Sequence, residues 1–434
     1  MSRIVAIVGR PNVGKSTLFN RLTESRDAIV DQVSGVTRDR HYGSVKWNGQ
    51  TFSVIDTGGY VHQSDDIFES EINRQVEIAI EEASVILFMV DVATGLTDLD
   101  ASVANMLRRS DRELITVVNK VDNNSRLLDA TEFYSLGLGE YQAVSSINGS
   151  GTGELLDTIV SLLPEEEPVP DPDIPRISVV GRPNVGKSTL LNTLTGENRN
   201  IVTPIAGTTR DSVYIRYNKF GYDMLLTDTA GLRRRSRVSE NVEFYSTLRS
   251  VRAIENSDVC LLMIDATLGL ESQDLTILNM IHSNNKGMVV LVNKWDLAEK
   301  DSMSARRMEQ YIRQKTSPFV DYPLIFISAM NKQRVHRMVK EALQVHENRK
   351  RKIPTSALNN YLLPIIEKNP PPSFKGKYIK IKYISQLPVY YPSFAFFCNL
   401  PQYVKEPYRR FLENRLRENF DFCGVPLKLF FRKK

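Results

Sequence analysis

Short apolar segments alternate with segments of helical periodicity along the first 163 residues. The apolar segments predict strands at residues 4–8, 51–55, 85–90, 114–118 and 141–144. The periodic segments predict helices at residues 15–22, 69–82, 99–108 and 153–162. This alternation is typical of an α/β fold in which a doubly wound, mostly parallel sheet carries helices on both faces. Ligands bind such sheets at the carboxyl ends of the strands, so the polar residues there are the first candidates for a site.

The chain repeats itself over a long period. Residues 8–18 and 180–190 share the sequence VGRPNVGKSTL, which places the two copies 172 residues apart. An offset of 174 carries Asn119-Lys120 onto Asn293-Lys294. A solenoid repeat is far shorter, so the pattern predicts a duplicated domain.

The repeat and the composition divide the chain into four segments. We predict a first domain over residues 1–163, a second over 176–350 and a third, without a counterpart, over 351–434. The segment PEEEPVPDPDIP at residues 164–175 has five carboxylates and five prolines. Proline blocks helix continuation and the acidic side chains repel one another, so this segment is predicted to be an extended linker.

The third segment predicts a helix, two strands, a second helix and a last strand, a small α+β domain. Over residues 378–384 the alternation places Ile379, Ile381 and Tyr383 on one face of a strand and Lys380 and Lys382 on the other. Residues 404–420 carry an apolar helical stripe. The stripe consists of Tyr408, Phe411, Leu412, Leu416 and Phe420, opposite Arg409, Arg410, Glu413 and Arg417. We expect these aromatic side chains to lie in a core rather than to form a base-stacking platform.

Positive charge is concentrated in the same segment. Residues 346–434 hold 18 Lys and Arg against 6 Asp and Glu, a net charge of +12, whereas residues 1–345 carry −7. This imbalance predicts a polyanionic partner for the third segment. The alternative is a solvated surface that only keeps the protein in solution.

Composition excludes several classes of protein. Apolar residues make up 41% of the 434 residues and charged residues 25%, which is ordinary for a folded protein. Three cysteines without paired spacing exclude a disulfide framework and fit a reducing cytoplasm, and the five histidines form no cluster with them, which predicts no zinc site. No apolar run is long enough for a membrane span, and the first residues predict no secretory signal.

Two segments carry the pattern G-x-x-x-x-G-K-S between a predicted strand and a predicted helix, at residues 9–16 and 181–188. In this context the pattern predicts a phosphate-binding loop, whose backbone N–H groups bind phosphate oxygens. We expect Lys15 and Lys187 to reach the β- and γ-phosphates and the hydroxyls of Ser16 and Ser188 to ligate Mg²⁺. The other expected contacts are Gly9, Gly14, Thr17, Gly181, Gly186 and Thr189.

Each copy also carries the motif D-x-x-G at the end of a strand. Asp56 and Asp228 are expected to hold Mg²⁺, commonly through water, while the N–H groups of Gly59 and Gly231 meet the γ-phosphate. Thr37 and Thr209 lie in polar loops before these strands. A threonine there ligates Mg²⁺ only while the γ-phosphate is present, which predicts a nucleotide-dependent order–disorder switch.

A third motif, N-K-x-D, predicts guanine as the base. Its aspartate accepts hydrogen bonds from N1–H and the N2 amino group of guanine, and adenine lacks this donor pair, so we expect GTP rather than ATP. The asparagine is expected at the base edge and the lysine stem over the ribose. Ser145-Ser146 and Ser328-Ala329 are expected to place a backbone N–H near guanine O6. The motif residues are Asn119, Lys120 and Asp122 in the first copy and Asn293, Lys294 and Asp296 in the second.

The residue that follows D-x-x-G does not fit the Ras pattern. Ras-type enzymes place a glutamine there to orient water, whereas this chain has Tyr60 and Leu232, which cannot polarise water. Asn12 and Asn184 lie inside the phosphate-binding loops, where a side-chain oxygen can help to hold a monovalent cation. From geometry alone, the alternative that these asparagines only shape the loop is favoured.

Together these motifs resemble the Der (EngA) family, tandem Era-like GTPases with a C-terminal KH-like domain. The resemblance rests on the doubled GRPNVGKS, the TRD that contains each loop threonine, DTGG in the first copy and DTAGLRRR in the second, and it covers essentially the whole chain. It implies a cytoplasmic bacterial GTPase that acts in assembly of the large ribosomal subunit. It also implies K⁺-stimulated hydrolysis linked to Asn12 and Asn184. The chain departs from the family at Ser145-Ser146, usually Ser-Ala, and at residues 328–333, which lack the usual glycine-rich turn.

The third segment looks like the family's KH-like domain but contains no G-x-x-G tetrapeptide. KH domains use that tetrapeptide to clamp single-stranded RNA, so we expect Lys and Arg contacts with phosphates of structured rRNA, or docking on the GTPase domains. We also hypothesise that the basic run at residues 233–237 moves with the nucleotide of the second copy. We expect a monomer without a DNA partner.

Two other functions are weighed against this one. A tRNA-modifying or membrane-transport GTPase needs an appended catalytic domain or membrane spans, and the sequence predicts neither. A nucleotide-gated RNA or ribosome-binding scaffold, with one catalytically weak GTPase domain, remains the alternative.

Overall fold

The computed structural model describes residues 3–23, 42–57, 72–73, 75–77, 79–80, 83–164, 174–196, 215–227, 250–298, 304–373 and 376–433. It divides into two compact units. The described residues from 3 to 164 form one unit, and those from 174 to 433 form the other. Among the described residues, no helix combines the length and apolarity that a membrane crossing needs.

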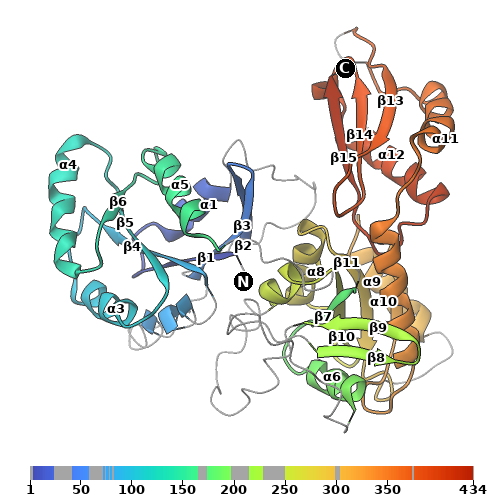
Figure 1. The fold of residues 1–434 in the computed structure, drawn as a ribbon, viewed down its shortest axis with the longest axis horizontal. Coiled ribbons are helices and arrows are strands. Elements are labelled where there is room, and N and C mark those ends of the chain that lie inside the picture. The colour runs from blue at the N-terminus through green and yellow to red at the C-terminus, as the bar shows by residue number, and fades with distance from the viewer. Residues whose placement is uncertain are drawn as a thin grey trace. The chain divides into compact units, whose positions relative to one another are not determined.

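The first unit is built on a six-stranded sheet in the order β2-β3-β1-β4-β5-β6 (Figure 1). Its strands are β1 (Ile4–Val8), β2 (Tyr42–Trp47), β3 (Gln50–Asp56), β4 (Val85–Asp91), β5 (Glu113–Asn119) and β6 (Tyr141–Ala143). Only the pairing of β2 with β3 is antiparallel. The parallel strands therefore end at one edge of the sheet, which confirms the predicted fold class.

Helices cover both faces of this sheet. They are α1 (Lys15–Thr23), α3 (Asp98–Arg108), α4 (Asn124–Asp129) and α5 (Thr152–Leu162), and the 3₁₀ helix η2 spans Ala130–Leu136. Leucines of α1 and α5 share one core with Ile7, Leu87 and Val117 of the strands. Figure 1 shows α3 on the opposite side of the sheet from α1 and α5. Within the predicted helix 69–82, the structure describes residues 72–73, 75–77 and 79–80, all of them helical.

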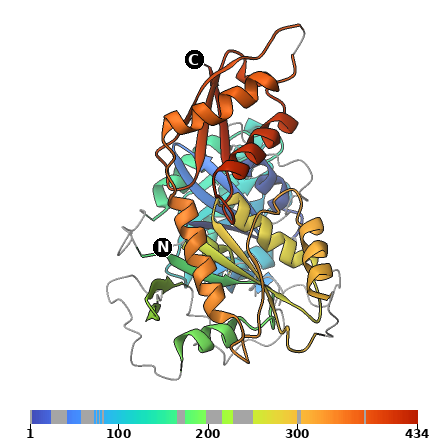
Figure 2. The same cartoon turned by 90° about the vertical axis from the view of Figure 1, so that its right-hand side faces the viewer.

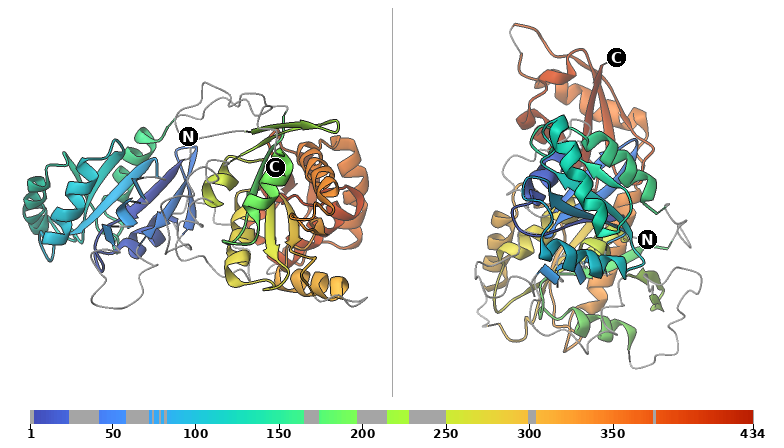
Figure 3. Two further views of the ribbon diagram at one scale, coloured as in Figure 1. Left: turned by 90° about the horizontal axis from the view of Figure 1, so that it is seen from below. Right: turned by 90° about the vertical axis from the view of Figure 1, so that its left-hand side faces the viewer.

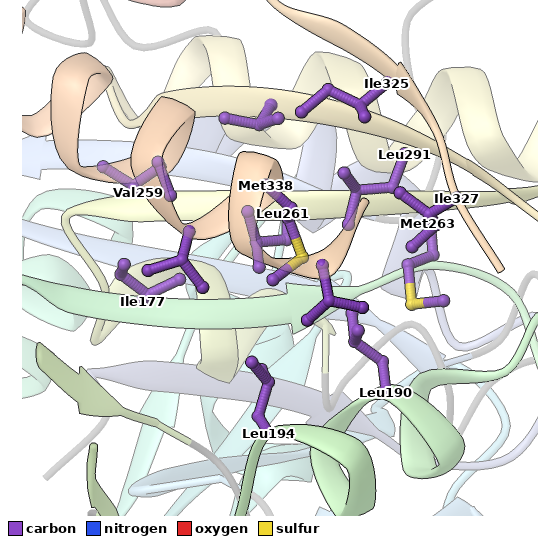
Figure 4. Close-up of a cluster of buried hydrophobic side chains, with 14 of the residues drawn as sticks. Ile177, Leu190, Leu194, Val259, Leu261, Met263, Leu291, Ile325, Ile327 and Met338 are labelled. Atoms are coloured by element: carbon purple, nitrogen blue, oxygen red, sulfur yellow. The ribbon is translucent and has the colours of Figure 1, made fainter. Parts of the chain in front are cut away.

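The second unit contains a matching sheet in the order β12-β11-β10-β7-β9-β8 (Figure 3). Its strands are β7 (Arg176–Val180), β8 (Ile215–Lys219), β9 (Tyr222–Leu226), β10 (Val259–Asp265), β11 (Gly287–Asn293) and β12 (Leu324–Phe326). Its helices are α6 (Lys187–Thr195), α8 (Ser272–Ser283), α9 (Ser304–Lys315) and α10 (Val335–Lys350). Figure 4 shows Leu190 and Leu194 of α6 and Met338 of α10 packed against strand residues such as Leu261.

The rest of this unit is a three-stranded sheet in the order β13-β14-β15 with two helices. The elements are α11 (Thr355–Lys368), β13 (Ile381–Gln386), β14 (Ser393–Cys398), the 3₁₀ helix η5 (Pro401–Tyr403), α12 (Glu406–Asn419) and β15 (Lys428–Lys433). The predicted order of helices and strands is confirmed. One prediction is wrong: Tyr383 does not share the face of Ile381, because an irregularity between the two shifts the register. Ile384 is buried instead, and Tyr383 is 41% exposed.

The three-stranded part directly contacts the six-stranded sheet of the same unit. Met288 N of β11 donates to Gly424 O at 2.7 Å, and Gly424 N donates to Asp321 O at 2.8 Å. Arg417 of α12 forms an ion pair with Asp321 at 2.8 Å. Arg417, predicted to lie on the polar face of its helix, is thus largely buried against the neighbouring sheet domain.

Candidate nucleotide-binding sites

The phosphate-binding loops follow β1 and β7 and lead into α1 and α6. Lys15 is buried, and its Nζ donates to Gly9 O at 2.7 Å and to Arg10 O at 2.8 Å. Lys187 does the same in the second copy, toward Gly181 O and Arg182 O, both at 2.6 Å. Burial lowers the pKa of Lys15 to about 8, an effect that the nearby Asp56 opposes and that Arg10 adds to. An ammonium held in this way is well placed to bind an anion.

The second glycine of each loop has no room for a side chain. Gly14 has a φ of +102°, and a Cβ on it would lie 2.4 Å from Nδ2 of Asn119. The equivalent distance from Gly186 to Asn293 Nδ2 is 2.3 Å. Glycine is therefore required where the loop meets the asparagine of the N-K-x-D motif.

The side-chain amide of that asparagine makes hydrogen bonds through both its nitrogen and its oxygen. Asn119 Nδ2 donates to Val13 O at 2.8 Å, and its Oδ1 accepts from Ser146 N at 3.0 Å. In the second copy, Asn293 Nδ2 donates to Val185 O at 2.8 Å and Oδ1 accepts from Ala329 N at 2.9 Å. The amide thus connects the phosphate-binding loop with the loop after the last strand, and its contact with the base edge stays a prediction.

The lysine of the motif forms an ion pair with an aspartate at the end of the neighbouring strand, outside the motifs named above. Lys120 Nζ lies 2.5 Å from Oδ2 of Asp91, the last residue of β4. Lys294 Nζ lies 2.6 Å from Oδ2 of Asp265, the last residue of β10. The ion pair fixes each lysine stem at the strand ends, beside the position expected for the ribose.

The aspartate of the motif has a different neighbour. Ser145 Oγ donates to Asp122 Oδ1 at 2.7 Å, and Arg126 Nη1 donates to Oδ2 at 2.9 Å. Asp296 of the second copy is half-buried. The first aspartate is thereby oriented by two donors, with its carboxylate partly exposed.

An arginine of each phosphate-binding loop pairs with an aspartate in the first turn of α3 or α8, the helix that follows the neighbouring strand β4 or β10. Arg10 Nε donates to Asp100 Oδ2 at 3.1 Å, and Arg182 Nε donates to Asp274 Oδ2 at 2.9 Å. Both aspartates are fully buried and close a capping box at the start of α3 or α8. Burial raises the pKa of Asp274, against the opposing effect of Arg182. We call these pairs the loop braces.

The residues expected to hold Mg²⁺ are brought together in the first copy. Ser16 Oγ donates to Asp56 Oδ2 at 2.5 Å, and Asp56 is fully buried at the end of β3. A hydroxyl and a carboxylate are the hard oxygen donors that Mg²⁺ prefers, so the donor set fits the ion. The corresponding Ser188 lies at the start of α6. The remaining predicted residues, Thr37, Gly59, Thr209, Asp228 and Gly231, lie outside the described residues.

The two loop asparagines adopt left-handed backbone conformations. The φ angle is +63° at Asn12 and +62° at Asn184, and both side chains are exposed. Asn12 O accepts from Lys120 Nζ at 3.2 Å. Asparagine tolerates this conformation better than most residues, so the residue type suits the loop whether or not it binds a cation.

The last guanine motif differs between the copies in sequence, but both copies have residues of positive φ at the same two positions. Gly149 and Gly151 have φ angles of +84° and +74°, and the residues at the same places in the second copy, Lys332 and Arg334, have +57° and +60°. Gln333 N donates to Ser328 O at 3.0 Å and closes the turn. The glycine-poor turn therefore keeps its shape at the cost of strain at Lys332 and Arg334.

Several residues that hold these candidate sites together are not predicted from the sequence motifs. A signal existed, because the repeat offsets connect them: 172 residues separate Arg10 from Arg182, and 174 separate Asp91 from Asp265 and Asp100 from Asp274. Each aspartate pair lies at a strand end or a helix start in both copies.

Comparison with known proteins matches the whole chain. The family model described as "50S ribosome-binding GTPase" matches residues 4–120 and 176–294, and the model described as "KH-domain-like of EngA bacterial GTPase enzymes, C-terminal" matches residues 352–432. The chain is 60% identical over 434 residues to GTPase Der of Christiangramia forsetii and 59% identical over 437 residues to GTPase Der of Porphyromonas gingivalis. Both alignments cover 100% of each chain.

Solved structures match parts of the chain. Era in complex with MgGDPNP and a segment of 16S ribosomal RNA is 24% identical, with a TM-score of 0.32, and the match covers 60% of this chain and 93% of Era. The G domain of the T. maritima FeoB iron transporter is 26% identical, with a TM-score of 0.27, covering 37% and 99%.

Proposed function

We propose that this chain, which belongs to the Der family of GTPases, acts in assembly of the large ribosomal subunit and docks on rRNA through its basic KH-like region. As a member of that family it is a GTPase, with GTP, GDP and Mg²⁺ as its ligands. The observation that carries the proposal is the match of both copies to a family described as ribosome-binding, followed by a segment with a net charge of +12.

Each copy is proposed to act on GTP with the same set of groups. Lys15 neutralises phosphate charge, and Ser16 with Asp56 holds Mg²⁺, which when bound neutralises charge on the β- and γ-phosphate oxygens. Asp122 selects guanine by accepting hydrogen bonds from N1–H and the N2 amino group of the base. The counterparts in the second copy are Lys187, Ser188, Asp228 and Asp296. Thr37 and Thr209, with Gly59 and Gly231, are proposed to sense the γ-phosphate.

Tyr60 and Leu232 stand where Ras-type enzymes have a water-orienting glutamine. Another group must therefore stabilise the negative charge that develops in the transition state. We assign this role to K⁺ held by Asn12 and Asn184, whose exposed side chains lie in the phosphate-binding loops. Replacing K⁺ by Na⁺ at constant ionic strength should slow turnover several-fold, and Asn12→Ala with Asn184→Ala should remove the difference. Equal rates in the two salts would contradict a role for K⁺.

The two GTPase domains, residues 1–163 and 176–350, are proposed to gate docking of the domain over 351–434. The hydrogen bonds that join β11 and Asp321 to Gly424 support this proposal, because they connect the second GTPase domain directly to the third domain. The protein is proposed to work as a cytoplasmic monomer. A second candidate, a scaffold with one weak GTPase domain, is favoured by the strained turn at Lys332 and Arg334, which the first copy lacks.

Sedimentation with purified ribosomal subunits tests the proposal. The full chain should pellet with large subunits and not with small subunits at the same salt concentration. Lys15→Ala and Lys187→Ala variants, assayed for GTP turnover, then show whether each copy hydrolyses GTP. Equal binding to both subunits would contradict the assignment to the large subunit, and turnover carried by one copy alone would favour the scaffold.

A further inference from the structure

One face of the three-stranded sheet β13-β14-β15 is covered, and the other is only partly accessible, because Ser393 and Ala395 on it are fully buried. Figures 1 and 2 show α11 and α12 on the same side of this sheet. The face toward these helices carries Ile384, Phe394 and Phe396, all fully buried. The other face, which we call the open face, carries Tyr383, Phe397 and Phe430.

The register of the strands places these rings close to one another. Tyr383 of β13 lies opposite Phe397 of β14, and their ring centroids are 5.8 Å apart at an interplanar angle of 43°. Phe430 of β15 lies opposite Ala395, one step along the same face of β14. Tyr383 is 41% exposed, and Phe397 and Phe430 are partly exposed. Three neighbouring strands thus each contribute one accessible ring.

The irregularity in β13 is what turns Tyr383 outward. Strict alternation from Ile381 would put Tyr383 in the core, but the register shift between these residues brings Ile384 there instead. A bulge commonly re-aims a side chain in this way. Its effect here is to expose a large ring that the sequence pattern predicts to be buried.

Positive charge surrounds the rings. Lys382, beside Tyr383, is exposed, and Arg432, also exposed, lies opposite Phe397 on β15. The three strands together, IKYISQ, SFAFFC and KLFFRK, contain four Lys and Arg and no Asp or Glu. Rings interleaved with cations match unpaired nucleotides, whose bases stack and whose phosphates are anionic.

We propose that the open face is a stacking platform for unpaired bases of RNA, with Tyr383 and Phe397 under the bases and Lys382 and Arg432 at the phosphates. The proposal rests on the proposed function, because it names how the third region contacts RNA. It gives this region, which lacks G-x-x-G, a means to bind single strands. Every base has a π-face, so binding is expected to tolerate sequence changes. In a duplex the bases are paired and stacked on one another, so a duplex should bind only through its phosphates.

Binding of short RNA by the full chain tests the platform. The probes are a fluorescein-labelled ten-nucleotide oligo-U and a blunt RNA duplex, followed by anisotropy at fixed salt. Tyr383→Ala should weaken oligo-U binding about tenfold and leave duplex binding unchanged. Lys382→Gln with Arg432→Gln should weaken both and flatten the salt dependence. Phe397→Leu, which keeps an apolar side chain but removes the ring, should act like Tyr383→Ala.

Tyr311→Ala is the matched control. Tyr311 in α9 is 42% exposed and also has a lysine, Lys315, over its ring. It should bind both probes like the unmodified chain. If Tyr383→Ala matches Tyr311→Ala on oligo-U, or if the unmodified chain prefers the duplex or fails to bind oligo-U, the platform is wrong. Sedimentation with large subunits distinguishes failure of the platform from failure of the proposed function. If the chain still binds large subunits but its oligo-U binding does not depend on Tyr383, only the platform is wrong.

Discussion

At the scale of single residues, the guanine motif shows side chains held by protein neighbours. Asp122 accepts from Ser145 at 2.7 Å and from Arg126 at 2.9 Å, so its carboxylate is fixed and yet partly exposed. A carboxylate fixed in this way can accept two parallel N–H bonds from a base without first giving up conformational freedom. The sequence motif predicts the residue, whereas its partner Arg126 becomes visible only in the structure.

Replacing this carboxylate by an amide should change the preferred nucleotide. Asp122→Asn should weaken GTP binding at the first site about a hundredfold, or about 2.7 kcal/mol, because an amide nitrogen cannot accept from N1–H. XTP binding should improve, since the amide can donate to the C2 oxygen of xanthine. Titration calorimetry with GDP and XDP, which carry the same two bases and are not hydrolysed, measures the change in base preference, with Asp296→Asn as the variant of the second site. An unchanged preference at either site would refute the guanine assignment there.

A second residue-scale prediction concerns the strained turn of the second copy. Lys332 is exposed and has a φ of +57°. Lys332→Gly should raise the free energy of unfolding of the second unit by about 1 kcal/mol, because glycine adopts this conformation without a Cβ penalty. Gln333→Gly, at a position without positive φ, should lower it. Urea unfolding monitors both variants, and a destabilised Lys332→Gly would show that no strain is stored there.

At the scale of elements, the predicted strands of the first domain and the predicted helices 15–22, 99–108 and 153–162 agree with the structure to within one residue at each end, whereas α4 and the 3₁₀ helix η2 are not predicted. The first hairpin was missed because Tyr42–Trp47 exposes polar side chains, although Asn48-Gly49 at its turn, with φ angles of +47° and +78°, is a hairpin signal. The irregularity in β13 could not be predicted, since alternation alone places Tyr383 inside. The loop braces join residues 90 or 92 positions apart, and no local pattern reveals such a pair.

The loop braces should matter for nucleotide affinity. Asp100→Asn keeps the shape of the side chain but leaves Arg10 without its buried anion, so the phosphate-binding loop of the first site should lose its fixed position. We expect GDP affinity at that site to fall about tenfold while the second site keeps its affinity. Asp274→Asn should reverse the pattern. Unchanged affinity at the altered site would show that the brace serves stability alone, which urea unfolding of the same variants measures.

At the scale of the whole molecule, the second sheet domain and the KH-like region share a compact unit, held by backbone hydrogen bonds and by Arg417. Cζ of Arg417 lies 5.4 Å from the ring centroid of Phe319, and His282 contacts the same ring. Burial, with a smaller effect of Arg417, lowers the pKa of His282 to about 4. The histidine is therefore neutral at this junction at neutral pH.

This junction should make the second unit sensitive to acid. In the unfolded chain His282 is protonated below about pH 6.5, whereas in the folded chain it is protonated only below about pH 4. The free energy of unfolding should thus fall by up to about 1.4 kcal/mol per pH unit between these values. His282→Gln should remove this part of the slope, and His336→Gln, at an exposed histidine, should not. Equal slopes in all three proteins would contradict the shifted pKa.

The central claim is that nucleotide bound in the two sheet domains controls docking on the large ribosomal subunit. The most direct measurement is the affinity of the full chain for purified large subunits, at one salt concentration, with GDP and with a non-hydrolysable GTP analogue. We predict affinities that differ at least tenfold between the two nucleotides, with the difference lost in a chain carrying Lys15→Ala and Lys187→Ala. Equal affinities in the unmodified chain would contradict the claim and leave the basic region as an electrostatic anchor.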